Sequence, residues 1–351
     1  MPDTIASLTQ GLPVEIGKID RALKQLWTEG EGSATRASLM NLAVYCEGAE
    51  MMAQTTEAIA EITRDHACRA ILIALDPTKS GVPVQATIQA HCHMSRAGAK
   101  QVCCEQITFL LGADGLPLIP NIVFSHLDSD LPLVLWWRAE FPEESEEQLW
   151  TWVDRLIYDS QSWEHIGTQW DLLQKNIEPA GHRMTLCDLN WTRSLYLRQA
   201  VAQIFDHPEF LGSLNDVCEA EIIHGPGMRS TALLLAGWLS AQLKWTFGSA
   251  NGAKLDFRCT ANHPAVITLC EEPGPALKGI TLKADTSSFE IMRHDGSSFL
   301  HADIHLPEIS TVHFLMPGGK EDIVSLLDDE LMSGGRHKVY LKAFAAISKA
   351  F

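Results

Sequence analysis

Residues 39–75, LMNLAVYCEGAEMMAQTTEAIAEITRDHACRAILIAL, decide the fold. Leu39 to Cys46 is an apolar run with the length of a buried strand. Met51 to Asp65 predicts a helix, and Ala70 to Leu75 is a second short apolar run. A strand, a helix and another strand in succession predict a domain in which helices pack on a sheet, which is the α/β class.

The same pattern continues on both sides of this stretch. Val84 to His93 alternates, with Val84, Ala86, Ile88 and Ala90 on one face, as expected of a half-buried strand. The first half is further expected to contain strands over 102–111 and 131–137, and helices over 15–28 and 141–154. Helices over 163–178 and 189–206 are expected to bridge to the second half.

The second half repeats this order of elements. It is expected to contain strands over 217–223, 255–260, 266–270, 280–284, 289–293 and 300–306, and helices over 231–243, 320–332 and 337–350. We therefore predict a mixed α/β (α+β) protein of two similar halves, each with a mostly mixed sheet flanked by helices. The expected domains are 1–160 and 211–351, joined by a helical connector over 161–210. Unrelated strand orders in the two halves would contradict a duplication.

Composition and charge exclude some classes of binding partner. Lys and Arg total 27 against 44 Asp and Glu, so the formal charge is −17, which repels nucleic-acid phosphates and anionic lipids. No apolar stretch approaches the length needed to span a bilayer, and the first residues lack a signal-peptide pattern. The nine cysteines form no CxxC pair, which favours reduced thiols in the cytoplasm. The expected partners include neither nucleic acid nor membrane.

Standard catalytic motifs are missing from the sequence. It contains no Walker A sequence, no GxSxG and no HExxH, and its two Gly-x-Gly runs lack the third glycine of a dinucleotide fingerprint. We therefore expect no catalytic residue and no cofactor.

His91-Cys92-His93 raises the question of a zinc site. On a strand the two histidines share one face, and Cys103-Cys104 lies in the next expected strand. Zinc accepts imidazoles and thiolates. Because nothing in the sequence sets the register between the strands, we expect buried, inert residues and no metal.

The segment Cys187 to Arg193 is followed by a helical pattern. Asp188 or Asn190 is expected to cap that helix, since a short acceptor side chain satisfies the first free amides. Arg198 falls on the apolar side of the helix, so its cation must reach solvent, pair with a carboxylate or meet a partner protein.

Residues 225–231, Gly-Pro-Gly-Met-Arg-Ser-Thr, precede an apolar helix. A glycine turn with Arg229, Ser230 and Thr231 at a helix start suits an anion such as a phosphate. The same residues also suit a plain turn in which Ser230 or Thr231 caps the helix. Both interpretations stay open.

Several of the ten tryptophans stand next to arginine, as in Trp136-Trp137-Arg138 and Trp191-Thr192-Arg193. Large aromatic residues and arginine are enriched in the centres of protein–protein interfaces. Tryptophan is equally common in cores, and the sequence alone does not separate the two roles.

Three of these runs occur in the order seen in the OpcA family: LPLVLWW at 131–137, DLNWTR at 188–193 and LLLAGWL at 233–239. From about residue 35 to the C-terminus, the chain resembles that family. DLNWTR is the most specific of the three runs.

This resemblance implies a non-catalytic protein that binds glucose-6-phosphate dehydrogenase and promotes its assembly or allosteric activation in the oxidative pentose phosphate pathway. The alternative is a sugar-phosphate or nucleotide-binding enzyme that uses Gly225 to Thr231. The resemblance and the aromatic–arginine pairs together provide the candidate partner-binding residues, which either contact the enzyme or maintain the fold: Trp136, Trp137, Arg138, Asp188, Asn190, Trp191, Thr192, Arg193 and Arg198.

Overall fold

The computed structural model describes residues 11–29, 34–36, 38–94, 101–143, 147–259, 263–307, 309–333 and 338–351. The chain divides into two compact units. The first comprises Met1–Tyr158 and Thr168–Cys187, and the second comprises Asp159–Gly167 and Asp188–Phe351. Residues 161–210, the expected helical connector, therefore contain segments of both units.

The first unit is built on a nine-stranded sheet with the order β1-β5-β6-β4-β3-β7-β8-β9, and β2 pairs with β6. Parallel pairs join β3 to β4 and β7, β4 to β6, and β7 to β8, whereas β5 is antiparallel to β6. Its strands are β1 (Leu12–Val14), β2 (Ala34–Arg36), β3 (Met40–Glu47), β4 (Cys68–Asp76), β5 (Gln85–Met94), β6 (Gln101–Gly112), β7 (Leu133–Arg138), β8 (Arg155–Tyr158) and β9 (Thr185–Asp188).

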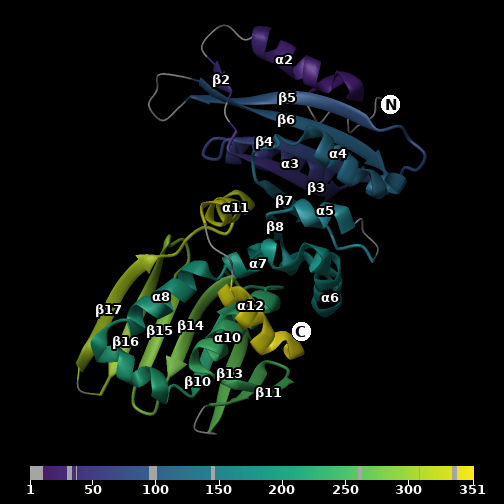
Figure 1. Ribbon diagram of the computed structural model, residues 1–351. Helices are drawn as coiled ribbons and strands as arrows, with labels where there is room; N and C mark the ends of the chain where they lie inside the picture. The colour runs from purple at the N-terminus through teal and green to yellow at the C-terminus, as the bar shows by residue number, and fades with distance from the viewer. Residues whose placement is uncertain are drawn as a thin grey trace. The chain divides into compact units, whose positions relative to one another are not determined.

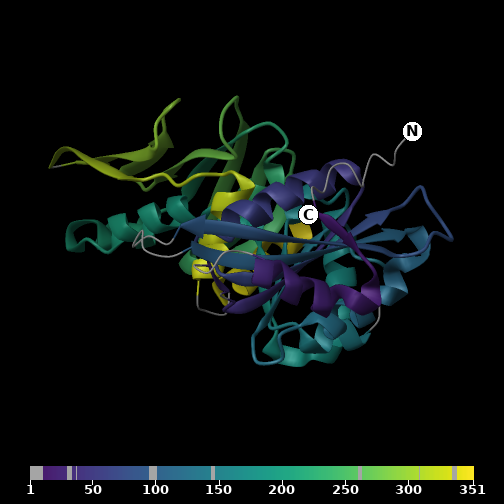
Figure 2. The ribbon, with the colours of Figure 1, turned by 90° about the horizontal axis from the view of Figure 1, so that it is seen from above.

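The centre of this sheet is covered on both faces. β3 and β4 are buried along nearly their whole length, which explains why their sequences are continuously apolar. The α3 helix contacts both of these strands, and α2 contacts β5; Figure 2 shows helices on either side of the strands. The helices are α2 (Ile19–Glu29), α3 (Ala49–Ile62), α4 (Ile119–His126), α5 (Glu147–Trp152) and α6 (Ile166–Ile177), with short 3₁₀ turns η1 (Ile16–Lys18), η2 (Ala113–Leu118) and η4 (Glu178–Arg183).

The second unit is built on an eight-stranded sheet with the order β11-β12-β13-β10-β14-β15-β16-β17. All neighbouring strands are antiparallel except β10 and β13, which are parallel. The strands are β10 (Glu219–His224), β11 (Thr246–Asn251), β12 (Lys254–Arg258), β13 (Pro264–Glu271), β14 (Leu277–Lys283), β15 (Ser288–Arg293), β16 (Phe299–Leu306) and β17 (Ile309–Pro317).

Helices cover one face of this second sheet. The α8 helix contacts β14 and β15, α10 contacts β10 and β13, and α12 packs along α10 (Figure 1). The helical segments of this unit are η3 (Ser160–Ser162), α7 (Leu189–Thr192), α8 (Leu195–Phe205), α9 (Pro208–Leu211), η5 (Gly212–Asp216), α10 (Arg229–Leu243), α11 (Ile323–Met332), α12 (Lys338–Ile347) and η6 (Ser348–Ala350).

The predicted fold class is confirmed, because both units consist of mixed sheets flanked by helices. The two halves are alike in this respect, but the hypothesis of a duplication is wrong. The first sheet is mainly parallel and the second is mainly antiparallel, with unrelated strand orders. The physical reason is that a run of strands and helices along the chain does not specify which strands pair.

Several elements differ from those expected. The sequence interpretation missed the helix α4 and the strands β8, β9, β11 and β17. The strand β11 is mostly exposed and polar, so it lacks an apolar pattern. Helix α5 is much shorter than the helix expected over 141–154, and Glu144 and Glu146 of that stretch lie outside the described residues. No helix in the described ranges is both long enough and apolar enough to cross a bilayer.

Candidate functional site

The DLNWTR run forms the centre of a buried polar network in the second unit. Asp188 is the N-cap of the one-turn helix α7, and its carboxylate accepts a hydrogen bond from the Asn190 amide at 3.0 Å, as expected of a cap. The same carboxylate accepts bonds from the Ser160 amide at 3.0 Å, the Ser160 hydroxyl at 2.6 Å and the Tyr340 hydroxyl at 3.0 Å. Asp188 is only 1% exposed, so these four donors replace water as its partners.

Asn190 extends the network toward the start of α10. Its side-chain amide donates to the hydroxyl of Ser160 at 3.1 Å and to that of Ser230 at 3.2 Å. Its carbonyl oxygen accepts a bond from the Thr231 hydroxyl. Because Asn190 is fully buried, its amide group serves as an internal connection between η3, α7 and α10.

Thr192 and Arg193 complete the run with two further connections. The Thr192 hydroxyl donates to the carboxylate of buried Glu330 on α11. The Arg193 guanidinium forms a two-pronged ion pair with Asp159, with N–O distances of 2.8 and 2.7 Å. A planar fork that meets both carboxylate oxygens is the strongest arrangement available to arginine.

Arg198 is held within the protein. Its guanidinium carbon lies 3.5 Å from the centre of the Trp191 ring, and its Nε donates to the Ser194 hydroxyl at 2.9 Å. The cation therefore stacks on an aromatic face, an interaction that retains its charge away from bulk water. The negative charge of Glu330 also acts on this cation. Contact of Arg198 with a partner protein stays a prediction.

Trp136, Trp137 and Arg138 lie on β7 in the first unit. Both tryptophans are buried, and the Trp137 ring stacks on Tyr45 with centroids 4.1 Å apart. Arg138 lies 4.6 Å above the Trp136 ring and donates to the Thr55 hydroxyl at 2.6 Å. In this conformation the tryptophans contribute packing, and they expose too little surface to form a docking patch.

The side chains of Arg229, Ser230 and Thr231 do not converge on a common point. Arg229 donates to the Gly252 carbonyl at 2.8 Å, whereas Ser230 and Thr231 bond inward to Asn190. The N-cap of α10 is Met228, with no side-chain capping bond, so the expected cap by Ser230 or Thr231 is wrong. The physical reason is that the helix already begins at Arg229, so both hydroxyls lie inside its first turn and bond to Asn190.

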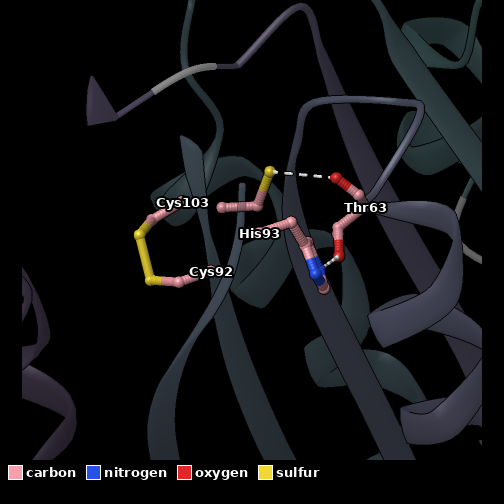
Figure 3. Close-up of a disulfide and its surroundings, with 5 residues drawn as sticks. Thr63, Cys92, His93 and Cys103 are labelled. Carbon is pink, nitrogen blue, oxygen red and sulfur yellow. Dashed lines mark hydrogen bonds between the residues drawn. A yellow bond between two sulfur atoms is a disulfide. The ribbon is translucent and has the colours of Figure 1, made fainter. Parts of the chain in front are cut away.

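The zinc candidates are likewise engaged with other groups (Figure 3). Cys92 and Cys103 face each other across β5 and β6 and form a disulfide. His93 Nε2 lies 3.2 Å from the Thr63 hydroxyl, and His91 Nε2 lies 2.8 Å from the Gln106 side-chain oxygen. No group of three metal-ligating side chains occurs among the described residues. The expectation that all cysteines are reduced is wrong for this pair, because the strand register places the two thiols opposite each other.

The partners of the DLNWTR run were not identifiable from the sequence. Asp159, Ser160, Glu330 and Tyr340 are separated from it by 28 to 152 positions along the chain. The sequence contained one weak signal. Tyr340 lies on the apolar side of the last expected helix, and a buried tyrosine hydroxyl needs a hydrogen-bond partner.

Asp188 is expected to make stability depend on pH. Burial raises the pKa of Asp188 to about 6, above the value of about 3.9 for an unfolded chain. Between these pH values the folded protein keeps a proton that the unfolded chain has lost. The contribution of Asp188 to the free energy of unfolding is therefore fully present below pH 4. It falls by about 3 kcal/mol as the pH rises to 6.

The measurement compares urea unfolding of the protein and of Asp188→Asn between pH 4 and pH 7. The difference in free energy of unfolding should change over pH 4–6 and then become constant. The comparison with the variant is needed because other carboxylates change stability in the opposite direction. Hydrogen bonds that outweigh desolvation lower the pKa values of Asp76 and Asp322, so these two groups add stability as the pH rises. A difference that is the same at every pH would contradict the prediction.

Comparison with known proteins gives matches over most of the chain. Residues 59–175 match the family model of a glucose-6-phosphate dehydrogenase subunit N-terminal domain, and residues 184–344 match the model of its C-terminal domain. A protein of Synechocystis sp. described as putative OxPP cycle protein OpcA is 29% identical over 190 residues, which are 53% of this chain and 39% of that protein. A Nostoc punctiforme protein of the same description is 29% identical over 208 residues, 58% of this chain and 43% of its own length.

These matches thus span about two fifths of the length of either relative. Among solved structures, the chain is similar to an aldose-aldose oxidoreductase from Caulobacter crescentus at 8% identity, with a TM-score of 0.48 over 88% of this chain and 96% of that one.

Proposed function

Because the chain belongs to the OpcA family, we propose that it is a non-catalytic partner that binds glucose-6-phosphate dehydrogenase and promotes its assembly or allosteric activation in the oxidative pentose phosphate pathway. The observation that carries this proposal is the match of both halves of the chain to domains named for a subunit of that enzyme.

The contacts of the candidate side chains support a structural role over a role in catalysis. Asp188, Asn190 and Thr192 are bonded to other side chains in the interior, as are the hydroxyls of Ser230 and Thr231. Groups held in this way stabilise the packing of the helices that carry them. The same bonds remove support from the sugar-phosphate or nucleotide-binding alternative at Gly225 to Thr231.

The proposed mechanism is a difference in affinity. A partner raises an enzyme's activity only if it binds one conformational or oligomeric state more tightly than another. A difference of about 1–3 kcal/mol gives roughly 5- to 150-fold coupling between the partner and glucose 6-phosphate. By linkage, glucose 6-phosphate is then expected to strengthen the complex by the same factor.

The test mixes the purified chain with glucose-6-phosphate dehydrogenase at micromolar concentrations. We expect a complex on size-exclusion chromatography and, at low glucose 6-phosphate, an activity that rises with added chain by a factor in the range of roughly 5 to 150. The chain assayed alone serves as the control and is expected to convert no substrate. An unchanged substrate curve without a complex, or turnover by the chain alone, would refute the proposal.

We further propose that this action takes place in the cytoplasm, without nucleic acid or membrane. The formal charge of −17 supports the absence of nucleic acid and membrane, because it repels phosphate backbones and anionic lipid headgroups. Measuring partition of the purified chain onto anionic vesicles and duplex DNA at low salt tests it, and retention on either would contradict it.

A further inference from the structure

The eight-stranded sheet of the second unit has one face under helices and one face open to solvent. Phe289 on β15 points to the helix side, where its ring lies 4.7 Å from that of Phe205 on α8. Along β10, β13, β15 and β16, burial alternates from residue to residue. Every second side chain therefore lies under the helices, and the others keep exposed surface on what we call the open face.

One row of the open face is largely apolar. In register from β13 to β17 it consists of Cys270, Ile223, Gly279, Met292, His301 and Leu315. The Met292 sulfur lies 2.1 Å from the position that a Cβ on Gly279 would take, so the thioether fills the space above the glycine. Leu315, at the end of the row, is 59% exposed. Exposed apolar side chains of this kind are the usual anchors of a protein interface.

The neighbouring row is acidic. In register it consists of Thr268, Glu221, Thr281, Glu290, Asp303 and His313. Glu290 is exposed, as is Glu219 two positions before Glu221 on β10. Two lysines lie on this face: Lys283 is opposite Glu219, and Lys254 on β12 is next to Thr268 at the end of the row. The open face thus combines an apolar row with a row of excess negative charge.

The dimensions of this face suit a protein partner. Eight strands at about 4.8 Å spacing and about six residues of length give roughly 34 by 20 Å. That is close to the roughly 800 Å² that one side of a standard interface buries. A hollow of about 780 Å³ at the β11–β13 end, whose lining includes Glu219, Asp256 and Arg258, adds a recess of mixed charge.

We propose that the open face is the surface on which this chain docks its partner, and that the partner presents a strip of lysine and arginine beside exposed apolar side chains. The acidic row selects the basic strip and increases the rate of encounter. The apolar row provides the affinity, with Leu315 and Met292 as anchors. The inference rests on the proposed function, which supplies glucose-6-phosphate dehydrogenase as the partner.

Charge argues against a second copy of this chain as the occupant. Two open faces brought together would each bring four carboxylates, from Glu219, Glu221, Glu290 and Asp303, against two lysines, Lys254 and Lys283. Each chain also carries a formal charge of −17. Like charges that face each other at an interface oppose association, so a basic partner is the occupant that this face fits.

The test measures the dissociation constant for glucose-6-phosphate dehydrogenase by biolayer interferometry with the full chain. The double variant Glu221→Lys/Glu290→Lys and the single variant Leu315→Asp are each expected to weaken binding at least tenfold. The matched controls are Asp206→Lys/Glu209→Lys, which makes the same charge change next to α8 and α9, and Met332→Asp, which changes an apolar side chain exposed by 74% on α11. Thermal unfolding of every variant verifies that it is folded.

The outcomes distinguish a wrong docking surface from a wrong proposed function. If the unaltered chain does not bind the dehydrogenase, the proposed function fails. If it binds and both folded open-face variants bind within twofold of it, or the controls weaken binding equally, the docking surface lies elsewhere and the function stands. A self-associating chain that becomes monomeric in the open-face variants would replace the basic partner with a second copy.

Discussion

Replacing Asp188 by alanine is expected to destabilise the protein by about 3–5 kcal/mol, the cost of leaving buried polar groups without their charged partner. The carboxylate accepts bonds from the Ser160 amide and hydroxyl, the Asn190 amide and the Tyr340 hydroxyl. Alanine offers no acceptor, and because Asp188 is only 1% exposed the four donors lose their partner away from bulk water. Urea unfolding at pH 7 measures the loss, which is a large part of an ordinary domain's stability.

Asp322→Ala is the matched control. Asp322 also caps a helix, α11, where it accepts bonds from the Ser325 amide at 3.0 Å and the Ser325 hydroxyl at 2.8 Å, but this cap is exposed. Its loss should cost only about 1 kcal/mol, because water replaces the carboxylate. If the two variants lose equal stability, burial of the Asp188 network does not determine its contribution.

Gly237→Ala is expected to destabilise the protein by at least about 3 kcal/mol, at the upper end for an overpacked core. Gly237 lies in α10 where that helix contacts α12, and a Cβ at this position would be 2.3 Å from the Ala343 carbonyl oxygen. The neighbouring Ile347 Cγ2 would be 2.8 Å away. Because the closer atom belongs to the backbone, one helix must move away from the other. Thermal and urea unfolding measure the effect.

The control for this prediction is Gly167→Ala in helix α6. A Cβ on Gly167 would meet nothing within 4 Å, so the change reports only helix propensity. Alanine there should raise stability by up to about 1 kcal/mol. A Gly237→Ala variant as stable as the unaltered protein would show that α10 and α12 do not approach as closely as described.

Much of the fold follows from the local pattern of the sequence. The apolar runs at 39–46 and 70–75 are the buried strands β3 and β4, and the pattern over 231–243 is most of α10. These elements were predictable because continuous apolar runs and 3.6-residue periodicity reflect burial, which is a local property of each segment. Short or exposed segments such as β11 carry no such pattern.

The candidate site was predictable only in part. The DLNWTR run stands out in the sequence, and the cap by Asp188 follows from its residue type and place. The interior position of Asn190 and the engagement of Ser230 and Thr231 did not follow. These depend on side chains brought together from distant parts of the chain.

The sequence by itself thus determined the class of fold, most strands and helices, and the family to which the chain belongs. The tertiary structure alone decided the two different strand orders, the disulfide between Cys92 and Cys103, the burial of Trp136 and Trp137, and the open face of the second sheet. The reason is that the periodicity of apolar residues indicates which side chains are buried but does not indicate which distant residues cover them. Each strand or polar side chain has many possible partners far away in the sequence. Which of them it pairs with is set only when the whole chain is packed.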